Sequence, residues 1–200
     1  MKELIIILEY IGTFAFAFTG ASVAAKSEYD FFGMLFLAFL TAVGGGTIRD
    51  MLLDVPVFWT ISSVSLYIIL IATLLTLFAR SIFNKMQSTI LLFDTIGLGI
   101  FAILGAQKAL ALNTNIETAI IMGIITGVLG GILRSVFNNE IPIIFKKEVY
   151  ATTAALCSVA FIGLSYLEIP YYLNISGTLI FCIIFRYSSI RFNIHLPKAK

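Results

Sequence analysis

Long apolar segments occupy almost the whole chain and leave only short polar stretches between them. Hydrophobic residues make up 60% of the 200 residues and charged residues 12%, and the mean hydropathy is +1.02. Soluble domains have about 45–50% apolar and about 25% charged residues. Because a membrane-spanning helix needs about 20 mostly apolar residues, the length allows roughly seven spans. The sequence therefore predicts an all-α membrane protein that forms a single transmembrane domain over residues 1–200.

Polar stretches divide the chain into predicted membrane-spanning helices at about residues 3–25, 31–53, 61–83, 88–111, 116–138, 149–168 and 170–187. The side of the membrane that holds the N-terminus carries three basic residues, Lys2, Arg49 and Lys108. The other side carries ten: Lys26, Arg80, Lys85, Arg134, Lys146, Lys147, Arg186, Arg191, Lys198 and Lys200. The positive-inside rule thus predicts an outside N-terminus and a cytoplasmic C-terminus, and reads the basic stretch from Arg186 to Lys200 as a topology signal.

The two halves of the chain align when one is shifted by 85 residues. The aligned pairs of rare residue types are Gly12–Gly97, Gly20–Gly105, Gly45–Gly130, Gly46–Gly131, Arg49–Arg134 and Glu9–Asp94. Each repeat, about 4–83 and about 88–168, holds three spans. Because three is an odd number, the second repeat must run opposite to the first, and the seventh helix at about 170–187 lies outside the repeat. Inverted repeats place transport sites near the bilayer midplane, where the halves meet.

Adjacent glycines followed by an arginine interrupt the second and fifth spans at equivalent places, as TAVGGGTIRD at 41–50 and GGILR at 130–134. Glycine costs about 1 kcal/mol in a helix interior relative to alanine, so we expect both helices to break there. Carbonyl oxygens freed by a break, with nearby hydroxyls, suit a partly hydrated cation. The predicted cation path comprises Thr41, Gly44, Gly45, Gly46, Thr126, Gly130 and Gly131. The alternatives are that the glycines allow close helix packing and that the threonines bond their own helix carbonyls.

Charged residues deep in the spans are the candidates for shaping or gating this path, namely Glu9, Arg49, Asp50, Asp94 and Arg134. From the helical rise, Glu9 lies at a similar depth to Arg49, and Asp94 to Arg134, which predicts two ion pairs, direct or bridged by water. Asp50 has Ser135 as its counterpart, so it either offsets Arg49 or concentrates cations at the mouth. The alternative is that the arginines are structural and that the acids hold them in place.

Other polar residues are expected near the membrane surface. Gln107 and Lys108 are expected at a solvated interface, and Lys146 and Lys147 are candidates for binding anionic lipid head groups. The cysteines Cys157 and Cys182 are expected to be small buried hydrophobes.

No enzyme chemistry is predicted. His195 is the single histidine, no nucleophile–base arrangement or nucleotide-binding glycine motif occurs, and no metal is expected beyond transient K⁺ or Na⁺. No cofactor is expected. The net charge of +2 is too small to indicate a nucleic-acid partner.

The pattern GGGTIRD, the second GGILR and the arrangement of three, three and one spans resemble the prokaryotic trimeric intracellular cation (TRIC) channel family over about residues 4–187. The resemblance implies a homotrimer with a pore in each protomer, formed by the first, second, fourth and fifth helices and kinked at the glycines. It implies conduction of potassium and, less well, of sodium. The second motif departs from the first at Leu129 and Ser135, so the two halves are not expected to coordinate ions equally.

The sequence and the resemblance together predict a potassium-preferring cation channel in the cytoplasmic membrane of a prokaryote, in contact with membrane lipids. One alternative is a secondary transporter for glycine or a similar zwitterion, because related bacterial sequences carry a glycine-transporter label and inverted repeats occur in transporters. A second alternative is a non-transporting membrane scaffold, which the deep charges speak against.

Overall fold

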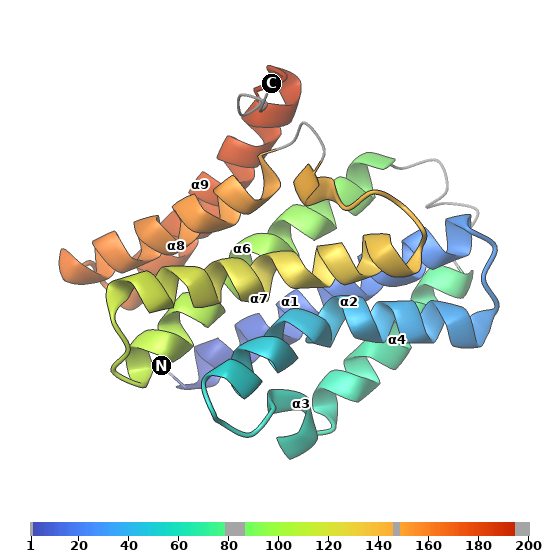
Figure 1. The fold of residues 1–200 in the computed structure, drawn as a ribbon, viewed down its shortest axis with the longest axis horizontal. Helices are drawn as coiled ribbons and strands as arrows, with labels where there is room; N and C mark the ends of the chain where they lie inside the picture. Colours follow the sequence, from blue (N-terminus) through green and yellow to red (C-terminus); the bar gives the residue numbers. More distant parts are fainter. Residues whose placement is uncertain (1, 79–86, 146–148, 195–200) are drawn as a thin grey trace.

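The computed structural model describes residues 2–78, 87–145 and 149–194, and this part of the chain consists of helices joined by short turns. The helices are α1 (Lys2–Lys26), α2 (Phe31–Leu52), α3 (Phe58–Ile61), α4 (Val64–Phe78), α6 (Gln87–Ala111), α7 (Ile116–Phe137), α8 (Tyr150–Tyr166) and α9 (Tyr171–Arg191), with one 3-10 turn, η1 (Ile143–Phe145). Figure 1 shows α2 and α7 crossing the middle of the molecule side by side, with α8 and α9 on one flank and α3 and α4 on the other.

The observed helices follow the predicted spans with two differences. The third predicted span is divided into the single turn α3 and the helix α4, and its predicted end at residue 83 falls outside the described residues. The last helix continues to Arg191 instead of ending at 187, so Arg186 belongs to a helix and not to a tail. Five of the described helices, α1, α2, α6, α7 and α9, are long and apolar enough to cross a membrane, and α4 and α8 are shorter apolar helices.

The helix ends repeat along the chain at the same offset of 85 residues. Asp30 caps α2 by accepting a hydrogen bond from the backbone N–H of Gly33 (2.7 Å), and Asn115 caps α7 in the same way from Thr118 (2.8 Å). Residues in the left-handed region also recur in pairs, Glu28 with Asn113 and Asp54 with Asn139. Asparagine and aspartate tolerate this conformation better than most residues, which helps each helix to stop at the same point in both repeats.

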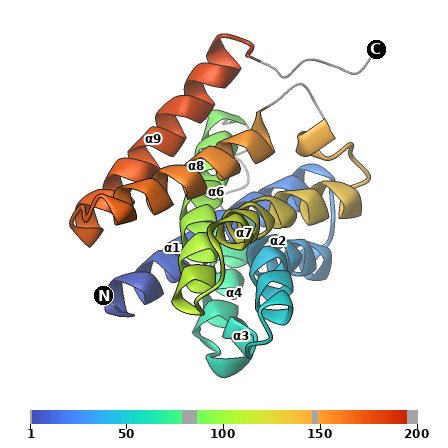
Figure 2. The same cartoon turned by 60° about the vertical axis from the view of Figure 1, so that its left-hand side comes forward.

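Four helices form the centre of the molecule, α1 and α2 from the first repeat and α6 and α7 from the second. In the first repeat α4 packs against α1 and α2, and in the second α8 packs equivalently against α6 and α7. The extra helix α9 packs against α6 and α8, so it covers only the second repeat; Figure 2 shows it on the far side of the molecule from α3 and α4.

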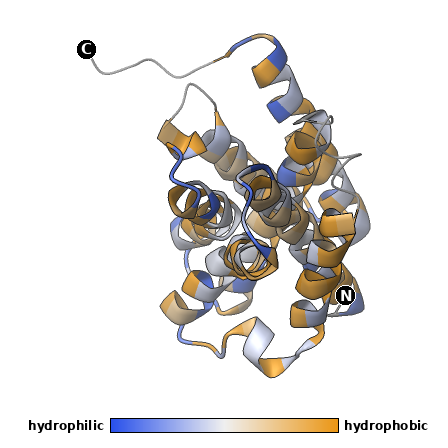
Figure 3. Cartoon of the chain, turned by 90° about the vertical axis from the view of Figure 1, so that its right-hand side faces the viewer, coloured by the Kyte–Doolittle hydropathy of each residue, from blue (hydrophilic) through white to orange (hydrophobic). Residues whose placement is uncertain are grey.

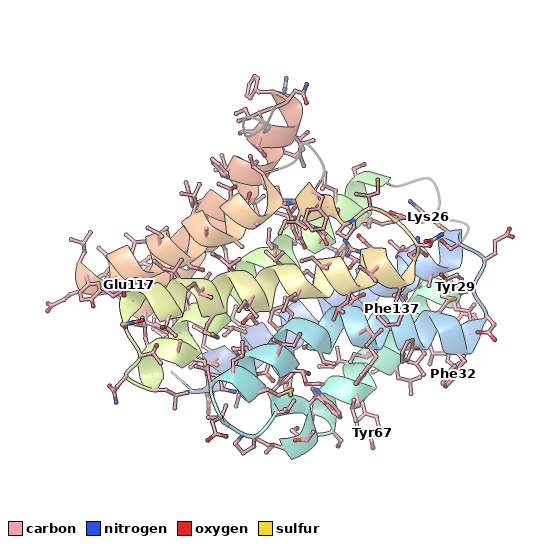
Figure 4. The ribbon with its side chains drawn as sticks, viewed as in Figure 1. Lys26, Tyr29, Phe32, Tyr67, Glu117 and Phe137 are labelled. Atoms are coloured by element: carbon pink, nitrogen blue, oxygen red, sulfur yellow. The ribbon has the colours of Figure 1, made fainter. Side chains whose placement is uncertain are left out.

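The surface of the helices is apolar, and polar residues gather at the turns. Figure 3 shows hydrophobic residues along most helices and hydrophilic ones at the connections between them. Lys26, Tyr29 and Phe137 mark one end of the molecule and Glu117 the opposite end (Figure 4). At the first end the Tyr29 hydroxyl donates to the backbone carbonyl of Phe137 (3.1 Å), which ties the α1–α2 turn to the end of α7.

Candidate ion pathway

The adjacent glycines bring α2 and α7 into backbone contact. A Cβ atom added to Gly45 would lie against the backbone carbonyl oxygen of Thr126, and one added to Gly130 would lie against that of Thr41, both closer than the 3.0 Å that real Cβ atoms keep. Because 41 pairs with 130 and 45 with 126, the two helices run antiparallel. Each contact is the repeat equivalent of the other, as expected for two units related by an approximate twofold axis.

The other glycines of the two motifs make room for side chains. Gly44 leaves space for Leu133, Gly46 for the ring of Phe58, and Gly131 for the hydroxyl end of Tyr150. The motifs therefore serve helix packing, which was the alternative reading of the sequence.

The prediction that α2 and α7 break at their glycines is wrong. Both helices are continuous, over Phe31–Leu52 and Ile116–Phe137, and no glycine of the described residues has a positive φ. The physical reason is that each glycine lowers helix propensity by only about 1 kcal/mol, whereas the close contact it permits brings many atoms of both helices into van der Waals range.

The threonine hydroxyls next to the crossing bond their own helices. Thr41 donates to the Leu37 carbonyl (2.6 Å) and Thr126 to the Met122 carbonyl (2.5 Å). Both side chains are buried. The backbone and the hydroxyls at the crossing are thus engaged, and the crossing is closed in this conformation.

A buried ion pair lies on one side of the crossing. Arg134 of α7 contacts Asp94 of α6 (Nη1–Oδ1 2.8 Å), so this predicted pair is confirmed. The same Arg134 nitrogen donates to the Thr19 hydroxyl of α1 (2.7 Å), which links three central helices. Both charged side chains are at most 5% exposed, and a buried charge needs such partners to remain ionised.

A second arginine, Arg186 of α9, reaches the same carboxylate. Its Nη2 lies 3.4 Å from Asp94 Oδ2, and its guanidinium stacks over the Tyr150 ring at 4.3 Å. Reading Arg186 as part of a basic topology tail was wrong, because the side chain is 2% exposed inside the molecule. Together, Asp94, Arg134, Arg186, Tyr150 and Thr19 form what we call the Asp94 cluster.

A polar pocket of about 340 Å³ opens onto the Asp94 cluster. The charged residues that line it come from four helices and from the turn after α7, and they are Lys26, Asp94, Arg134, Glu140 and Arg186. Because Lys26 lines it, the pocket lies at the end of the molecule that Lys26 marks in Figure 4. The pocket leads from that end of the molecule to the Asp94 carboxylate, which is 3% exposed.

A second charged cluster lies on the other side of the crossing, around Asp50. This fully buried carboxylate accepts from Arg49 Nε (2.7 Å) and Lys108 Nζ (2.8 Å) through Oδ1, and from the Phe58 backbone N–H (3.0 Å) through Oδ2. Arg49 also lies over the Phe58 ring at 5.9 Å. We call Arg49, Asp50, Lys108 and Phe58 the Asp50 cluster. Asp50 therefore offsets Arg49, one of the two roles predicted for it.

The direct ion pair predicted between Glu9 and Arg49 is wrong. Within the described part of the chain, the carboxylate that contacts Arg49 is Asp50, its neighbour in sequence. In the second repeat the neighbour of Arg134 is Ser135, and the carboxylate that contacts this arginine is Asp94. Glu9 is partly buried and interacts electrostatically with Arg49 and Lys108. A water-bridged pair between Glu9 and Arg49 therefore stays a prediction.

Gln107 and Lys108, which were predicted at a solvated interface, are half-buried and also have partners inside the protein. Lys108 pairs with Asp50, and Gln107 exchanges hydrogen bonds with the Tyr171 hydroxyl of α9 (2.6 and 2.9 Å). Lys146 and Lys147, the lipid candidates, lie outside the described residues. Cys157 and Cys182 are buried and free, as expected.

Replacing Lys108 with glutamine is expected to lower the free energy of unfolding by about 1 kcal/mol, between the values typical of exposed and buried pairs. The loss is limited because Asp50 keeps Arg49 and the Phe58 N–H, and because the Lys108 side chain is 32% exposed. Thermal unfolding in detergent measures it, with Lys26→Gln, which removes an exposed lysine, as the control. Equal midpoints for the two variants would show that the Lys108–Asp50 pair contributes nothing.

A match to a known protein family also divides the chain into two repeats. The family model described as "Glycine transporter" matches the chain twice, over residues 6–81 and 91–166, again 85 residues apart. The inner membrane protein YadS of Escherichia coli (strain K12), a UPF0126 protein, is 35% identical over 193 residues, which cover 95% of this chain and 93% of YadS. The UPF0126 membrane protein YvgT of Bacillus subtilis (strain 168) is 35% identical over 96% of this chain and 94% of its own length.

Solved structures match over nearly the whole chain. A TRIC trimeric intracellular cation channel orthologue from Rhodobacter sphaeroides superposes with a TM-score of 0.90 and 34% identity, covering 96% of this chain and 99% of that one. A structure determined to explain conductance through TRIC cation channels gives a TM-score of 0.87 and 36% identity over 97% and 96% of the two chains. The protein is a multi-pass membrane protein, and it belongs to the prokaryotic TRIC channel family, whose sequence model carries the glycine-transporter description.

Proposed function

We propose that this protein is a passive cation channel that prefers potassium and conducts through a path within each protomer. The observation that carries the proposal is the match, over 96–97% of the chain, to structures of TRIC cation channels. The path would run between α1, α2, α6 and α7, from the polar pocket past the Asp94 cluster, across the α2–α7 crossing and past the Asp50 cluster. Since the crossing is closed, conduction requires α2 and α7 to separate there.

The polar pocket would be the cytoplasmic mouth. The lysine and arginine distribution favours a cytoplasmic location for this end of the molecule, which carries Lys26, and an outside location for the N-terminus. This orientation needs seven spans, so α4 and α8 would cross the membrane despite their lengths of 15 and 17 residues. Locally thinned bilayer and adjoining chain at their ends would make up the difference.

The functional assembly would be a homotrimer in the cytoplasmic membrane of a prokaryote. The trimeric TRIC orthologue from Rhodobacter sphaeroides, which matches almost the full chain, supports this assembly. Lys146 and Lys147 would lie at the cytoplasmic surface, where anionic head groups attract basic residues.

The conformation supports ion pairs as the means of holding the path shut. Burying five charged side chains, two on one side of a closed crossing and three on the other, is costly unless they pair, and each carboxylate pairs with two cations. Permeating K⁺ would replace one of these cations as the path opens.

Purified protein in a planar bilayer tests the function. With potassium chloride at unequal concentrations on the two sides, we expect discrete current steps that reverse near the potassium equilibrium potential. Replacing K⁺ by N-methyl-glucamine should abolish them, and bilayers that received detergent alone are the control. Silent bilayers together with saturable, gradient-coupled glycine uptake into liposomes would contradict the channel and favour the transporter.

A further inference from the structure

Helix α9 places a cation on the carboxylate that the polar pocket leads to. Asp94 offers two oxygens: Oδ1 contacts Arg134 at 2.8 Å and Oδ2 contacts Arg186 at 3.4 Å. Charge-assisted N–H···O contacts are usually about 2.7–2.9 Å, so the contact with Arg186 is the looser one. Asp94 is the buried acid of the pocket, and Arg186 is the residue that occupies its second oxygen.

Arg186 comes from outside the repeat that builds the rest of the path. Asp94 and Arg134 belong to α6 and α7, whereas Arg186 belongs to α9, which packs only against α6 and α8 among the membrane-spanning helices. Among the described residues, no helix of the first repeat holds the equivalent position. Its cluster uses Lys108 of α6 as the second cation instead.

Contacts other than the ion pair also position the Arg186 guanidinium. It lies over the ring of Tyr150, whose hydroxyl fits against Gly131 of α7 and donates to Asp94 Oδ1 (3.5 Å). One turn earlier on α9, the Cys182 sulfur packs against the bare backbone of Gly99 on α6, where a Cβ would lie 2.9 Å away. The first repeat has Phe14 at the position of Gly99, so this seat for α9 exists in one repeat only.

We propose that Arg186 acts as a tethered competitor for permeating cations: its guanidinium occupies the Asp94 oxygen that K⁺ would otherwise reach from the polar pocket. This inference rests on the proposed channel function and assigns α9 the control of one mouth of the path. A fixed positive charge at the end of a narrow pocket lowers the local concentration of K⁺ and competes for its ligand. The effect is strongest at low ionic strength, where screening is weak.

Arg186→Gln tests the proposal, with Arg191→Gln as the matched control. Both variants remove one arginine charge from α9, but Arg191 is exposed at the end of the helix. Single-channel conductance is measured at about 0.01 M and about 1 M KCl, where the Debye lengths are about 30 Å and about 3 Å. We expect Arg186→Gln to raise conductance at least about twofold at low salt, the effect of one charge about 10 Å away in water. The increase should shrink at high salt and be absent in Arg191→Gln.

A structural role for Arg186 gives different results. Arg186→Lys, which keeps the charge, should conduct like the wild type. If Arg186→Lys and Arg186→Gln change conductance equally at both salt concentrations, or if Arg186→Gln matches Arg191→Gln, the proposal is overturned. Should Arg186→Gln not fold, Tyr150→Leu removes the ring beneath the guanidinium without changing formal charge, and should raise conductance at low salt where Tyr150→Phe does not. Unchanged conductance in Tyr150→Leu would then count against the proposal.

A binding measurement separates this inference from the channel function itself. Thermal unfolding of each variant is followed in KCl and in choline chloride at equal ionic strength, because a bound cation stabilises the folded state. Freeing Asp94 Oδ2 should make Arg186→Gln more stable in KCl than in choline chloride by a larger margin than Arg191→Gln. This result with silent bilayers would refute the channel and leave only the competition between Arg186 and K⁺ for Asp94. If the wild type conducts and the difference in stability between KCl and choline chloride is equal in the two variants, the inference is refuted and the channel stands.

Discussion

Replacing Gly45 with alanine is expected to lower the free energy of unfolding by more than about 3 kcal/mol and to sharply reduce the yield of folded protein. The added Cβ meets the backbone carbonyl of Thr126 on α7. Overpacking usually costs about 1–3 kcal/mol when side chains can yield. Here the obstacle is the backbone of a continuous 22-residue helix, so the whole of α7 would have to move.

An equivalent variant and a control variant test whether the close contact causes this loss. Gly130→Ala should be equally harmful, because its Cβ meets the Thr41 carbonyl in the equivalent contact. Gly163→Ala is the control, since nothing lies within 4 Å of the added atom and alanine favours the α8 helix by about 1 kcal/mol. Thermal unfolding and the yield of monodisperse protein on size exclusion are the measurements. A Gly45→Ala protein as stable as Gly163→Ala would rule out the tight crossing.

Replacing Asp94 with asparagine is expected to destabilise the protein by about 3–5 kcal/mol. Arg134 is buried, and without the carboxylate its main remaining described partner is the neutral Thr19 hydroxyl. Removing one partner of a buried pair leaves a charge in a medium that solvates it poorly, which costs more than the pair itself contributes. Thermal unfolding of the purified protein measures the loss.

Asp54→Asn is the control for this variant because it makes the same chemical change at an exposed site. Asp54 has a φ of 53°, and the repeat equivalent with the same backbone conformation is already an asparagine, Asn139. We expect Asp54→Asn to be nearly neutral. The double variant Asp94→Asn/Arg134→Gln should lose less stability than the sum of the two single variants. Strict additivity would indicate that the two side chains do not depend on each other.

The helices, the repeat and one ion pair could be predicted because each depends on local sequence or on depth along a helix. Apolar length gave the spans to within a few residues, and the rare residue types gave the offset of 85 that the helix caps and the family match also follow. The Asp94–Arg134 pair followed from the helical rise alone, because both residues lie at one depth on adjacent helices.

The remaining features depend on tertiary contacts that the sequence pattern does not encode. The glycines were expected to break their helices because helix propensity is a local property of the sequence. The helix that packs closely against them, and so stabilises them as helix, lies about 85 residues away in the sequence. The sequence left two roles open for Asp50, and its direct contact with Arg49 was not specified because residues adjacent in sequence usually point to different faces of a helix. Arg186 was missed because arginines near the end of a span usually face the head groups, and only the packing of α9 on α6 and α8 turns it inward.

The crossing of α2 and α7 also determines how the two ends of the molecule can move relative to each other. The Gly45 and Gly130 contacts lie near the middle of both helices, about 18 Å from the start of α2 at a rise of about 1.5 Å per residue. Two stiff rods touching at their midpoints behave as a pair of levers on a shared fulcrum. A tilt of roughly 10° therefore displaces each end by about 3 Å in opposite directions. One small rotation can widen the space beside α2 and α7 at one end of the molecule while narrowing it at the other, with no change to either backbone.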